Sequence, residues 1–150
     1  MIREMTMEDV PRVAEMARDF HKYAIADKGL GFSPSDFVRH SIFLMESPIA
    51  NILVLEIEGK AVGTIAGIVS PWFMDFSQLL LTELWWWVDP EHRKGNLSFS
   101  LLDALAEWGQ YCGASMFTIV SIGTEREEII KRYYKRKGFN HIETHFIKEI

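Results

Sequence analysis

The sequence is poor in cysteine and in long apolar runs. Cys112 is the one cysteine among 150 residues, so no internal disulfide can form, and a reducing compartment such as the cytoplasm is expected. No run reaches the roughly 18 apolar residues that a transmembrane helix needs, and residues 1–4 carry no hydrophobic signal segment. We therefore expect a cytoplasmic protein that has no membrane partner.

Positive charge is also in short supply. The 16 lysines and arginines are outnumbered by 21 aspartates and glutamates, which leaves a net charge of −5. A general nucleic-acid-binding surface must neutralise phosphates, so no nucleic-acid partner is expected. Hydrophobic residues make up 48% of the chain and charged residues 25%, which excludes a disordered or fibrous protein. Without repeats, low-complexity tracts or linkers, residues 1–150 are expected to form a single domain.

Capping signals and apolar periodicity predict alternating helices and strands. In the first half we expect a strand at 2–4, a helix after Thr6, a loop at 21–32, a helix after Ser33, and strands at 52–58 and 61–69 joined by a Gly59-Lys60 turn. An aromatic-rich connection at 71–78 is expected to lead to a strand at 79–88, a helix at 97–112 and a strand at 115–122. The last elements expected are a helix from a capping box at Thr124 and Glu127 to about Lys137, a glycine cap at Gly138, and an extended segment at 139–150. The helix between strands 79–88 and 115–122 implies that these two strands pair in parallel. The order predicts a mixed sheet covered by helices.

The most informative segment is residues 83–96, Glu-Leu-Trp-Trp-Trp-Val-Asp-Pro-Glu-His-Arg-Lys-Gly-Asn. It leads from an apolar strand through a polar turn into a helix. The first N–H groups of a helix have no intrahelical partner, and the helix dipole adds positive potential there, so such a turn suits a phosphate group. The alternative is that Gly95-Asn96 only joins a strand to a helix, with Asn96 as its cap.

Two motifs in this order resemble the GNAT superfamily of acetyl-CoA-dependent N-acetyltransferases. The first is Val88-Asp89-Pro90-Glu91-His92-Arg93, and the second is Tyr134-Lys135-Arg136-Lys137-Gly138-Phe139. The resemblance extends over nearly the whole chain, and in style the chain looks most like the small GNATs of tailed bacteriophages. It implies an α/β (mixed α+β) fold with a mostly antiparallel central sheet, helices on both faces, and a splayed pair of central parallel strands.

The resemblance also implies acetyl-CoA as cosubstrate. In the family, the pantetheine arm pairs with the end of the strand before the turn, and the pyrophosphate rests on the amides of the turn. Here the glycines of the usual turn are replaced by Asn96 and Ser98, while a glycine stands at position 95; asparagine tolerates positive φ, so the loop is expected to keep its shape. The residues expected to bind CoA are Trp86, Trp87, Val88, Arg93, Lys94, Gly95, Asn96, Leu97, Ser98 and Phe99.

By the same resemblance, Tyr134 stands where the family has the tyrosine that protonates the departing thiolate. Its spacing to Gly138-Phe139 favours it over its neighbour Tyr133. The alternative is that both tyrosines only pack a helix on the sheet. An asparagine that contacts CoA in many relatives is replaced here by Glu127, which the predicted capping box explains without a ligand.

Glu83 is the leading candidate for the general base. A carboxylate in an apolar strand has a raised pKa if it lacks a strong partner, and could then accept a proton from the acceptor amine. Strand alternation places it on the face of Trp85 and Trp87, opposite Trp86, unless a β-bulge changes the parity. It could equally be a structural, hydrogen-bonded acid. The other candidates, His141, Glu143 and His145, are expected to be solvated or paired, and no metal site is predicted.

The acceptor is an amine, either of a small molecule or of a protein. In the family its pocket is shaped by the loop between the first two helices, here 21–32, and by a C-terminal hairpin for which residues after Phe139 are too few. An open site suits a protein lysine or N-terminus, and a homodimer could complete it. The three tryptophans are expected to be core, or to line the cleft and attract the amine. Two functions remain open: an N-acetyltransferase, or a degenerate relative that acts as a CoA-binding or host-protein-modulating module.

Overall fold

The computed structural model describes residues 1–93 and 95–150, and its sheet has five strands among these residues. Strands β1 to β4 pair antiparallel in chain order, and β5 pairs parallel with β4. The strands are β1 (Ile2–Glu4), β2 (Ala50–Ile57), β3 (Lys60–Trp72), β4 (Asp75–Val88) and β5 (Met116–Thr118). The expected mixed, mostly antiparallel sheet and the parallel pairing of its last two strands are confirmed.

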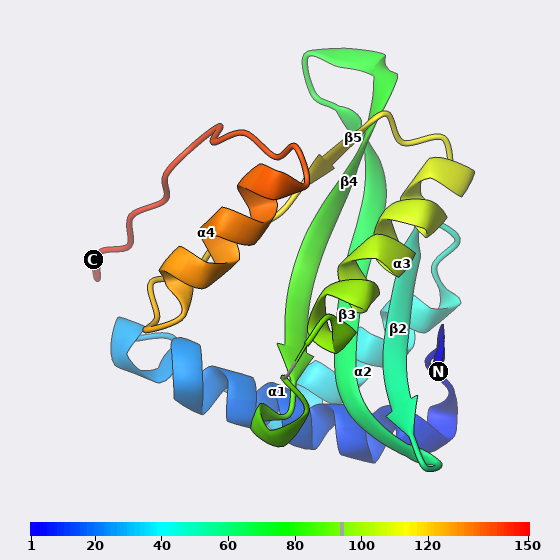
Figure 1. The fold of residues 1–150 in the computed structure, drawn as a ribbon, viewed down its shortest axis with the longest axis vertical. Coiled ribbons are helices and arrows are strands. Elements are labelled where there is room, and N and C mark those ends of the chain that lie inside the picture. The colour runs from blue at the N-terminus through cyan, green and yellow to red at the C-terminus, as the bar shows by residue number, and fades with distance from the viewer. Residues whose placement is uncertain (94) are drawn as a thin grey trace.

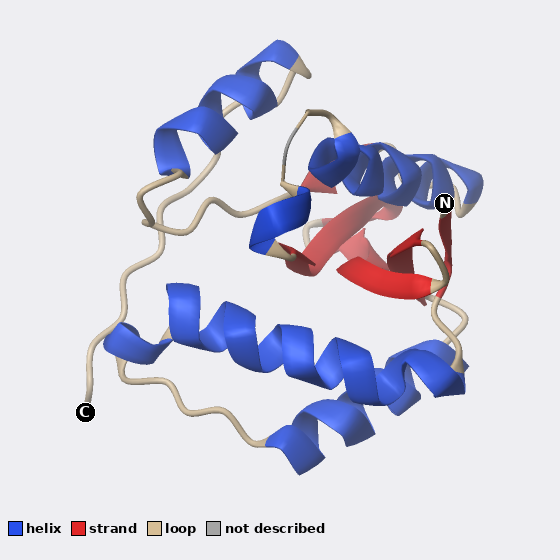
Figure 2. Ribbon diagram, turned by 60° about the horizontal axis from the view of Figure 1, so that its bottom comes forward, coloured by secondary structure: helices blue, strands red, loops and turns tan. Residues whose placement is uncertain are grey.

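Helices cover both faces of this sheet (Figure 1). Helices α1 (Val10–Ala24) and α2 (Pro34–Glu46) pack on one face, and Figure 2 shows them as a layer separate from α3 (Leu97–Tyr111). Helix α4 (Glu127–Arg136) shares the core of α3, because its two tyrosines pack with the leucines of that helix. Short 3₁₀ turns lie at 7–9, 26–28 and 90–92. Of the helices in the described residues, none is long and apolar enough to cross a bilayer.

Local signals placed several boundaries correctly. Ser33 begins α2, and its hydroxyl accepts a hydrogen bond from the amide of Asp36 at 3.3 Å. Gly59 adopts φ 76° in the turn between β2 and β3, and Gly138 adopts φ 87° after α4. These left-handed conformations are open to glycine at little cost, so both turns are explained by the sequence.

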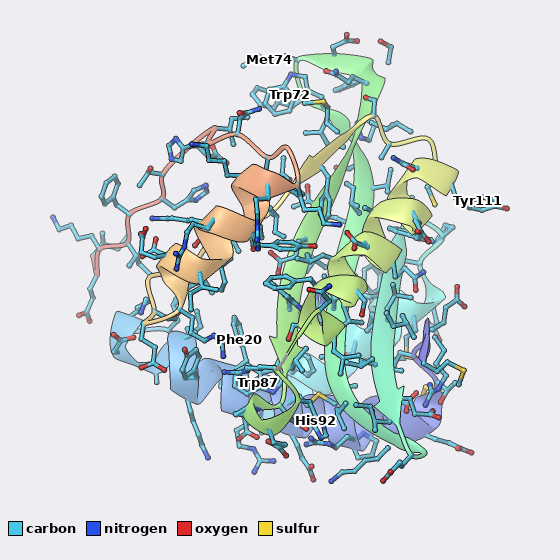
Figure 3. All side chains as sticks on the ribbon, viewed as in Figure 1. Phe20, Trp72, Met74, Trp87, His92 and Tyr111 are labelled. Carbon is cyan, nitrogen blue, oxygen red and sulfur yellow. The ribbon has the colours of Figure 1, made fainter. Side chains whose placement is uncertain are left out.

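The connection predicted at 71–78 is wrong. Trp72 pairs with Asp75, so β3 and β4 form one continuous hairpin whose turn is only Phe73 and Met74. The hairpin projects from the body of the molecule, with Trp72 and Met74 near its tip (Figure 3). Pairing between the strands satisfies backbone groups that an isolated aromatic stretch would leave open, and this tertiary effect is absent from local sequence signals.

Several other boundaries also differ from prediction, including that of β5, which spans only Met116–Thr118 of the predicted 115–122. Helix α1 continues to Ala24, into the predicted loop. Helix α4 begins at Glu127 rather than at Thr124, and the Glu127 carboxylate binds the Lys131 side chain at 2.6 Å instead of closing a capping box. The last segment, 139–150, forms no strand, and its residues from 140 onward are exposed. It runs past the outer side of α4 in Figure 1.

The parallel pair β4 and β5 is splayed. The two strands pair only where Leu80 to Thr82 lie beside Met116 to Thr118. Beyond Thr82 they diverge, so the β4 edge from Glu83 to Val88 has no strand partner on that side among the described residues. Because 139–150 does not pair with β5, the splayed pair lies at the edge of the sheet rather than in its centre.

We predict that Gly109→Ala destabilises the fold. Gly109 is where α3 lies closest to β4, and a Cβ atom there would meet the Leu81 side chain at 2.7 Å. Leu81 is only 1% exposed and cannot move aside freely, so overpacking should cost about 1–3 kcal/mol of unfolding free energy. Urea unfolding would measure the loss. Gly31→Ala is the matched control, because nothing lies within 4 Å of its Cβ position; equal stability of the two variants would contradict the prediction.

Candidate functional site

A cavity of about 260 Å³ lies where β4 and β5 diverge. Its walls come from the end of β4, the turn into α3, the segment 120–126, helix α4 and the C-terminal half of α1. Most residues singled out from the sequence line it together: Glu83, Trp86, Trp87, Val88, Arg93, Gly95, Ser98, Phe99 and Tyr134. Side chains from segments far apart in the sequence, from α1 to α4, therefore converge on one apolar space.

A β-bulge at Leu84 decides which way Glu83 points. Ala66 pairs with Trp85, whereas Gly67 pairs with Glu83, so Leu84 is the extra residue on β4. Paired residues share a face of the sheet, and the bulge therefore moves Glu83 to the α3 face, together with Trp86. The prediction that Glu83 shares the face of Trp85 and Trp87 is wrong for this reason.

Glu83 is buried and carries a perturbed carboxyl group. Its exposed fraction is 8%, and its one hydrogen bond within the described residues is from the amide of Val120 to Oε2, at 3.3 Å. Burial raises the pKa of Glu83 from 4.5 to about 7, and the Val120 amide offsets only part of that rise. A carboxyl group with this pKa exchanges its proton near neutral pH.

Tyr134 faces the same cavity from α4. Its hydroxyl donates a hydrogen bond to the carbonyl oxygen of Val120 at 2.9 Å. Val120 thus binds both functional groups, through its amide to Glu83 and through its carbonyl to Tyr134. Burial and then the nearby Glu83 raise the pKa of Tyr134, so the hydroxyl keeps its proton. An acceptor and a donor of protons are therefore both hydrogen-bonded to the backbone of one residue, Val120.

In the turn into α3, the residue with a left-handed backbone conformation is not the one expected. The left-handed conformation falls on Gly95, with φ 68°, and Asn96 has φ −95°. The Asn96 side chain makes no capping hydrogen bond, so the first amides of α3 are left without a side-chain cap. Its carbonyl accepts the amides of Phe99 and Ser100, which closes the first turn of the helix. Lys94, also predicted to bind CoA, lies outside the described residues.

Not every predicted binding residue reaches the cavity. Asn96 and Leu97 do not line it, and Leu97 is 44% exposed. Conversely, three buried polar atoms that do face this region have no hydrogen-bond partner among the described residues: Trp86 Nε1, Ser98 Oγ and Ser121 Oγ. Unsatisfied buried donors are costly, so a polar ligand that hydrogen-bonds to them would be favoured. These atoms fit a ligand such as the amide-rich arm of CoA.

Several lining residues were not identified from the sequence. They include Phe20 on α1 and Val120, Ser121 and Arg126 before α4, whereas Tyr23, which also lines the cavity, belongs to the 21–32 segment expected to shape the acceptor pocket. Figure 3 shows Phe20 close to Trp87, and their ring centroids are 6.2 Å apart. The apolar position of Phe20 on its helix was visible, but nothing local indicates that α1 reaches the end of β4.

The tryptophans divide between the two faces as expected. Trp85 packs on Phe37 of α2, with ring centroids 5.1 Å apart, whereas Trp86 packs on Phe99 of α3. Trp86 and Trp87 both line the cavity, and Trp87 is also part of the buried core. The cation that contacts the Trp87 ring belongs to the protein itself and not to a substrate amine, because the Arg93 guanidinium carbon lies 4.2 Å from the ring centroid.

A buried ion pair fixes the end of β4. Asp89 binds the Arg12 guanidinium of α1 and accepts the Trp87 indole N–H at 3.2 Å. The Asp89 amide donates to the carbonyl of Val62 at 2.9 Å, so the residue is also held to β3. This network joins α1 to the cavity wall that contains Trp87.

We predict that Asp89→Asn destabilises the protein by about 1–3 kcal/mol, since Arg12 would lose its buried charged partner and keep only the exposed Glu15 while staying three-quarters buried. The asparagine oxygen can still accept the Trp87 indole N–H, so the loss of unfolding free energy reports the removal of the negative charge alone. Chemical unfolding would measure it. Asp19→Asn, on the exposed side of α1, is the control; a variant at position 89 as stable as this control would refute the role of the ion pair.

The remaining candidate bases lie away from the cavity. His141, Glu143 and His145 are exposed in the segment after α4, and His145 pairs with Glu143 at 3.1 Å. They do not line the site, in agreement with their expected solvated or paired state. Among the described residues, no group of three or more His, Cys, Asp or Glu side chains could hold a metal ion.

Comparison with protein families gives one extended match. The model of the acetyltransferase (GNAT) family matches residues 13–139. The match includes every described residue that lines the cavity. No curated protein matches the chain significantly.

Solved structures of similar fold cover nearly the whole chain. A protein described as a transcriptional regulator from Bacillus halodurans C-125 superposes with a TM-score of 0.80 at 15% identity, over 100% of this chain and 99% of that one. A ribosomal-protein-alanine N-acetyltransferase from Brucella melitensis biovar Abortus 2308 gives 0.75 at 13% identity, over 100% and 99%. A predicted acetyltransferase from Clostridium acetobutylicum, solved with acetyl-CoA, gives 0.75 at 13% identity, over 99% and 95%. At these identities the similarity shows the fold.

Proposed function

The chain belongs to the acetyltransferase (GNAT) family and is an N-acetyltransferase that uses acetyl-CoA; from this premise we propose that it transfers the acetyl group directly to a primary amine. In the proposed reaction, both substrates are bound together. The amine nitrogen attacks the thioester carbonyl, the C–S bond breaks, and the thiolate leaves with a proton. The residues of one 150-residue domain would supply the proton acceptor, the proton donor and the binding groups.

Glu83 is the proposed general base. An amine attacks only in its neutral form, so a protonated amine must first lose a proton. The pKa of about 7 lets the Glu83 carboxylate take that proton near neutral pH, directly or through water. The bulge turns Glu83 toward the cavity, which supports this role. The observation that carries the proposal is that Glu83 and Tyr134 line the same cavity.

Tyr134 is the proposed general acid. Its raised pKa keeps the hydroxyl protonated, and its hydrogen bond to the Val120 carbonyl holds it in the cavity wall. A thiolate formed in this cavity is a stronger base than the same thiolate in water, because burial disfavours its negative charge. Proton transfer from Tyr134 would remove that charge as the C–S bond breaks.

The proposed CoA site uses both backbone and side chains. The unpaired edge of β4, at Trp86 to Val88, offers main-chain groups to the pantetheine arm, and the uncapped start of α3 at Gly95 to Ser98 offers amides to the pyrophosphate. Within this turn, Ser98 and Phe99 line the cavity, whereas Asn96 and Leu97 would contribute through their amides alone. Arg93 is proposed to bind an anionic group of the substrate.

The acceptor is proposed to be an amine on a protein, a lysine or an N-terminus, rather than an enclosed small molecule. The segment 139–150 forms no hairpin over the cavity, which leaves the site accessible to a large substrate. The Brucella melitensis relative is named for a protein acceptor, a ribosomal-protein alanine. A homodimer that completes the site, and a source in a bacteriophage, stay predictions; the relatives described above come from cellular organisms.

A two-stage experiment tests this function. Calorimetric titration with acetyl-CoA measures cofactor binding, and free-thiol release is then measured with a panel of lysine peptides, N-terminal peptides and polyamines. We expect binding in the micromolar range and thiol release with at least one peptide class. Binding without turnover on any amine would favour the degenerate CoA-binding module, and no binding at millimolar acetyl-CoA would exclude both.

A further inference from the structure

Arg93 is held rigidly at one end of the cavity. Its Nε donates to the Val88 carbonyl at 2.6 Å, and its guanidinium carbon lies 4.2 Å from the Trp87 ring centroid and 5.2 Å from that of Tyr23. These contacts occupy the face of the guanidinium and one of its nitrogens. Its two terminal nitrogens make no hydrogen bond to any residue in the described part of the chain. A pre-organised cation with free donors is thus available at the cavity wall.

Arg126, immediately before α4, lines the same cavity. The two positive charges interact: burial and then the charge of Arg126 lower the pKa of Arg93. Within residues 1–93 and 95–150, neither guanidinium forms an ion pair within 4 Å. The carboxylates of Asp89 and Glu125 offset part of this effect on the pKa of Arg93 without forming an ion pair with it; Asp89 is bound to Arg12, and Glu125 accepts the Tyr23 hydroxyl at 3.4 Å.

Two like charges beside a mostly apolar cavity are unfavourable without a counter-charge. The arrangement contrasts with the net charge of −5 on the chain as a whole. An oxyanion between the two guanidinium groups would remove the repulsion and accept several charge-assisted hydrogen bonds. The unpartnered hydroxyls of Ser98 and Ser121 line the same cavity and could donate to the same ligand.

We propose that Arg93 and Arg126 form a two-arginine oxyanion site that joins the two walls of the cavity. The site rests on the proposed function for the entry of CoA into this cavity, and it adds a side-chain clamp from the α4 side to the backbone amides of the α3 turn. Its ligand is an oxyanion of a substrate, either a phosphate of CoA or a carboxylate of the acceptor. Arg126 then acts as a specificity-determining residue rather than as a catalytic one.

The first arm of the test measures phosphate recognition by calorimetry, at constant ionic strength and without turnover. CoA and pantetheine are titrated into the wild-type protein, Arg126→Ala, Arg126→Lys and the control Arg132→Ala, which alters an exposed arginine of α4. If the ligand is a phosphate, Arg126→Ala weakens CoA binding roughly tenfold or more and leaves pantetheine binding unchanged. Arg126→Lys should restore part of the affinity, and Arg132→Ala should match the wild type.

The second arm measures carboxylate recognition on the protein already saturated with CoA. N-acetylglycine and its uncharged amide serve as probes of the acceptor side. If the ligand is a carboxylate, the wild type prefers N-acetylglycine, and Arg126→Ala abolishes that preference while CoA binding is unchanged. Equal losses for charged and uncharged ligands, or no loss in either arm, would overturn the proposal. Both arms read binding alone, so an inability to acetylate amines would overturn the proposed function and leave this site standing.

Discussion

Tyr134→Phe is expected to lower kcat roughly 10²–10⁴-fold, the usual contribution of a positioned proton donor. The change removes the hydroxyl and keeps the ring, so the stacking of Tyr134 on its neighbours, including Phe139 with centroids 5.5 Å apart, is preserved. The KM for acetyl-CoA should change little, because the hydroxyl binds Val120 rather than the wall that holds the cosubstrate. Steady-state kinetics with the best acceptor from the amine panel would measure both constants.

The neighbouring tyrosine provides the control. Tyr133 is on the same helix and is equally buried, but it does not line the cavity and its hydroxyl has no partner among the described residues. Removing an unpartnered hydroxyl costs little, so Tyr133→Phe should retain wild-type kcat. If Tyr134→Phe also retained it, or if both variants lost activity equally, Tyr134 would not be the proton donor.

Glu83→Gln is expected to remove one limb of the pH–rate profile. In the wild type, kcat/KM should rise as the pH passes through about 7, because the base must be deprotonated. Glutamine can still accept the Val120 amide but cannot take a proton, so the variant should lose roughly 10²–10⁴-fold at pH 8 and lack the limb near 7. A limb set by the amine itself would remain. A variant that kept the limb near 7 would exclude Glu83 as the base.

Although Glu83→Gln should lower activity at pH 8, it should raise the free energy of unfolding relative to the wild type at that pH. The pKa of Glu83 is raised in the folded state, so its protonated form contributes stability that is fully present below about pH 4.5 and lost as the pH rises to about 7. Over that interval the wild type should lose roughly 3 kcal/mol relative to Glu83→Gln. Urea unfolding of both proteins at pH 5 and pH 8 would measure the difference. A difference that does not change with pH would mean that Glu83 is not buried as a titrating acid. Glu107→Gln, at an exposed site on α3, controls for a general effect of removing a carboxylate.

The parts of the fold that local chemistry determines could be predicted from the sequence. The Ser33 cap, the Gly59 turn and the Gly138 cap each need particular residues at particular φ angles, and those residues mark the positions. The parallel pairing of β5 followed from the intervening helix, because a crossover of this kind favours it. The two motifs, with the strand and the turn beside them, then placed about half of the cavity-lining residues.

The parts that depend on tertiary pairing could not be predicted in this way. Nothing in the sequence around Leu84 indicates a bulge, since its position depends on the registers of β3 and β4. The approach of α1 to the end of β4 is made through contacts such as the Arg12–Asp89 pair, whose members are 77 residues apart. Arg126 was missed because the loop before α4 was interpreted as part of a capping box, which describes only local backbone.

The extra residue at Leu84 makes the chemistry of this strand depend on residue count. An insertion of one residue between Ala66 and Gly67 of β3 would leave β4 itself unchanged, yet it would give Leu84 a pairing partner, and regular alternation along β4 would then turn Glu83 away from Trp86. A change of one residue in strand length at the bulge could therefore abolish acetyl transfer in a related protein. Insertions and deletions at this position of related sequences would be more informative about lost activity than substitutions elsewhere in the strand.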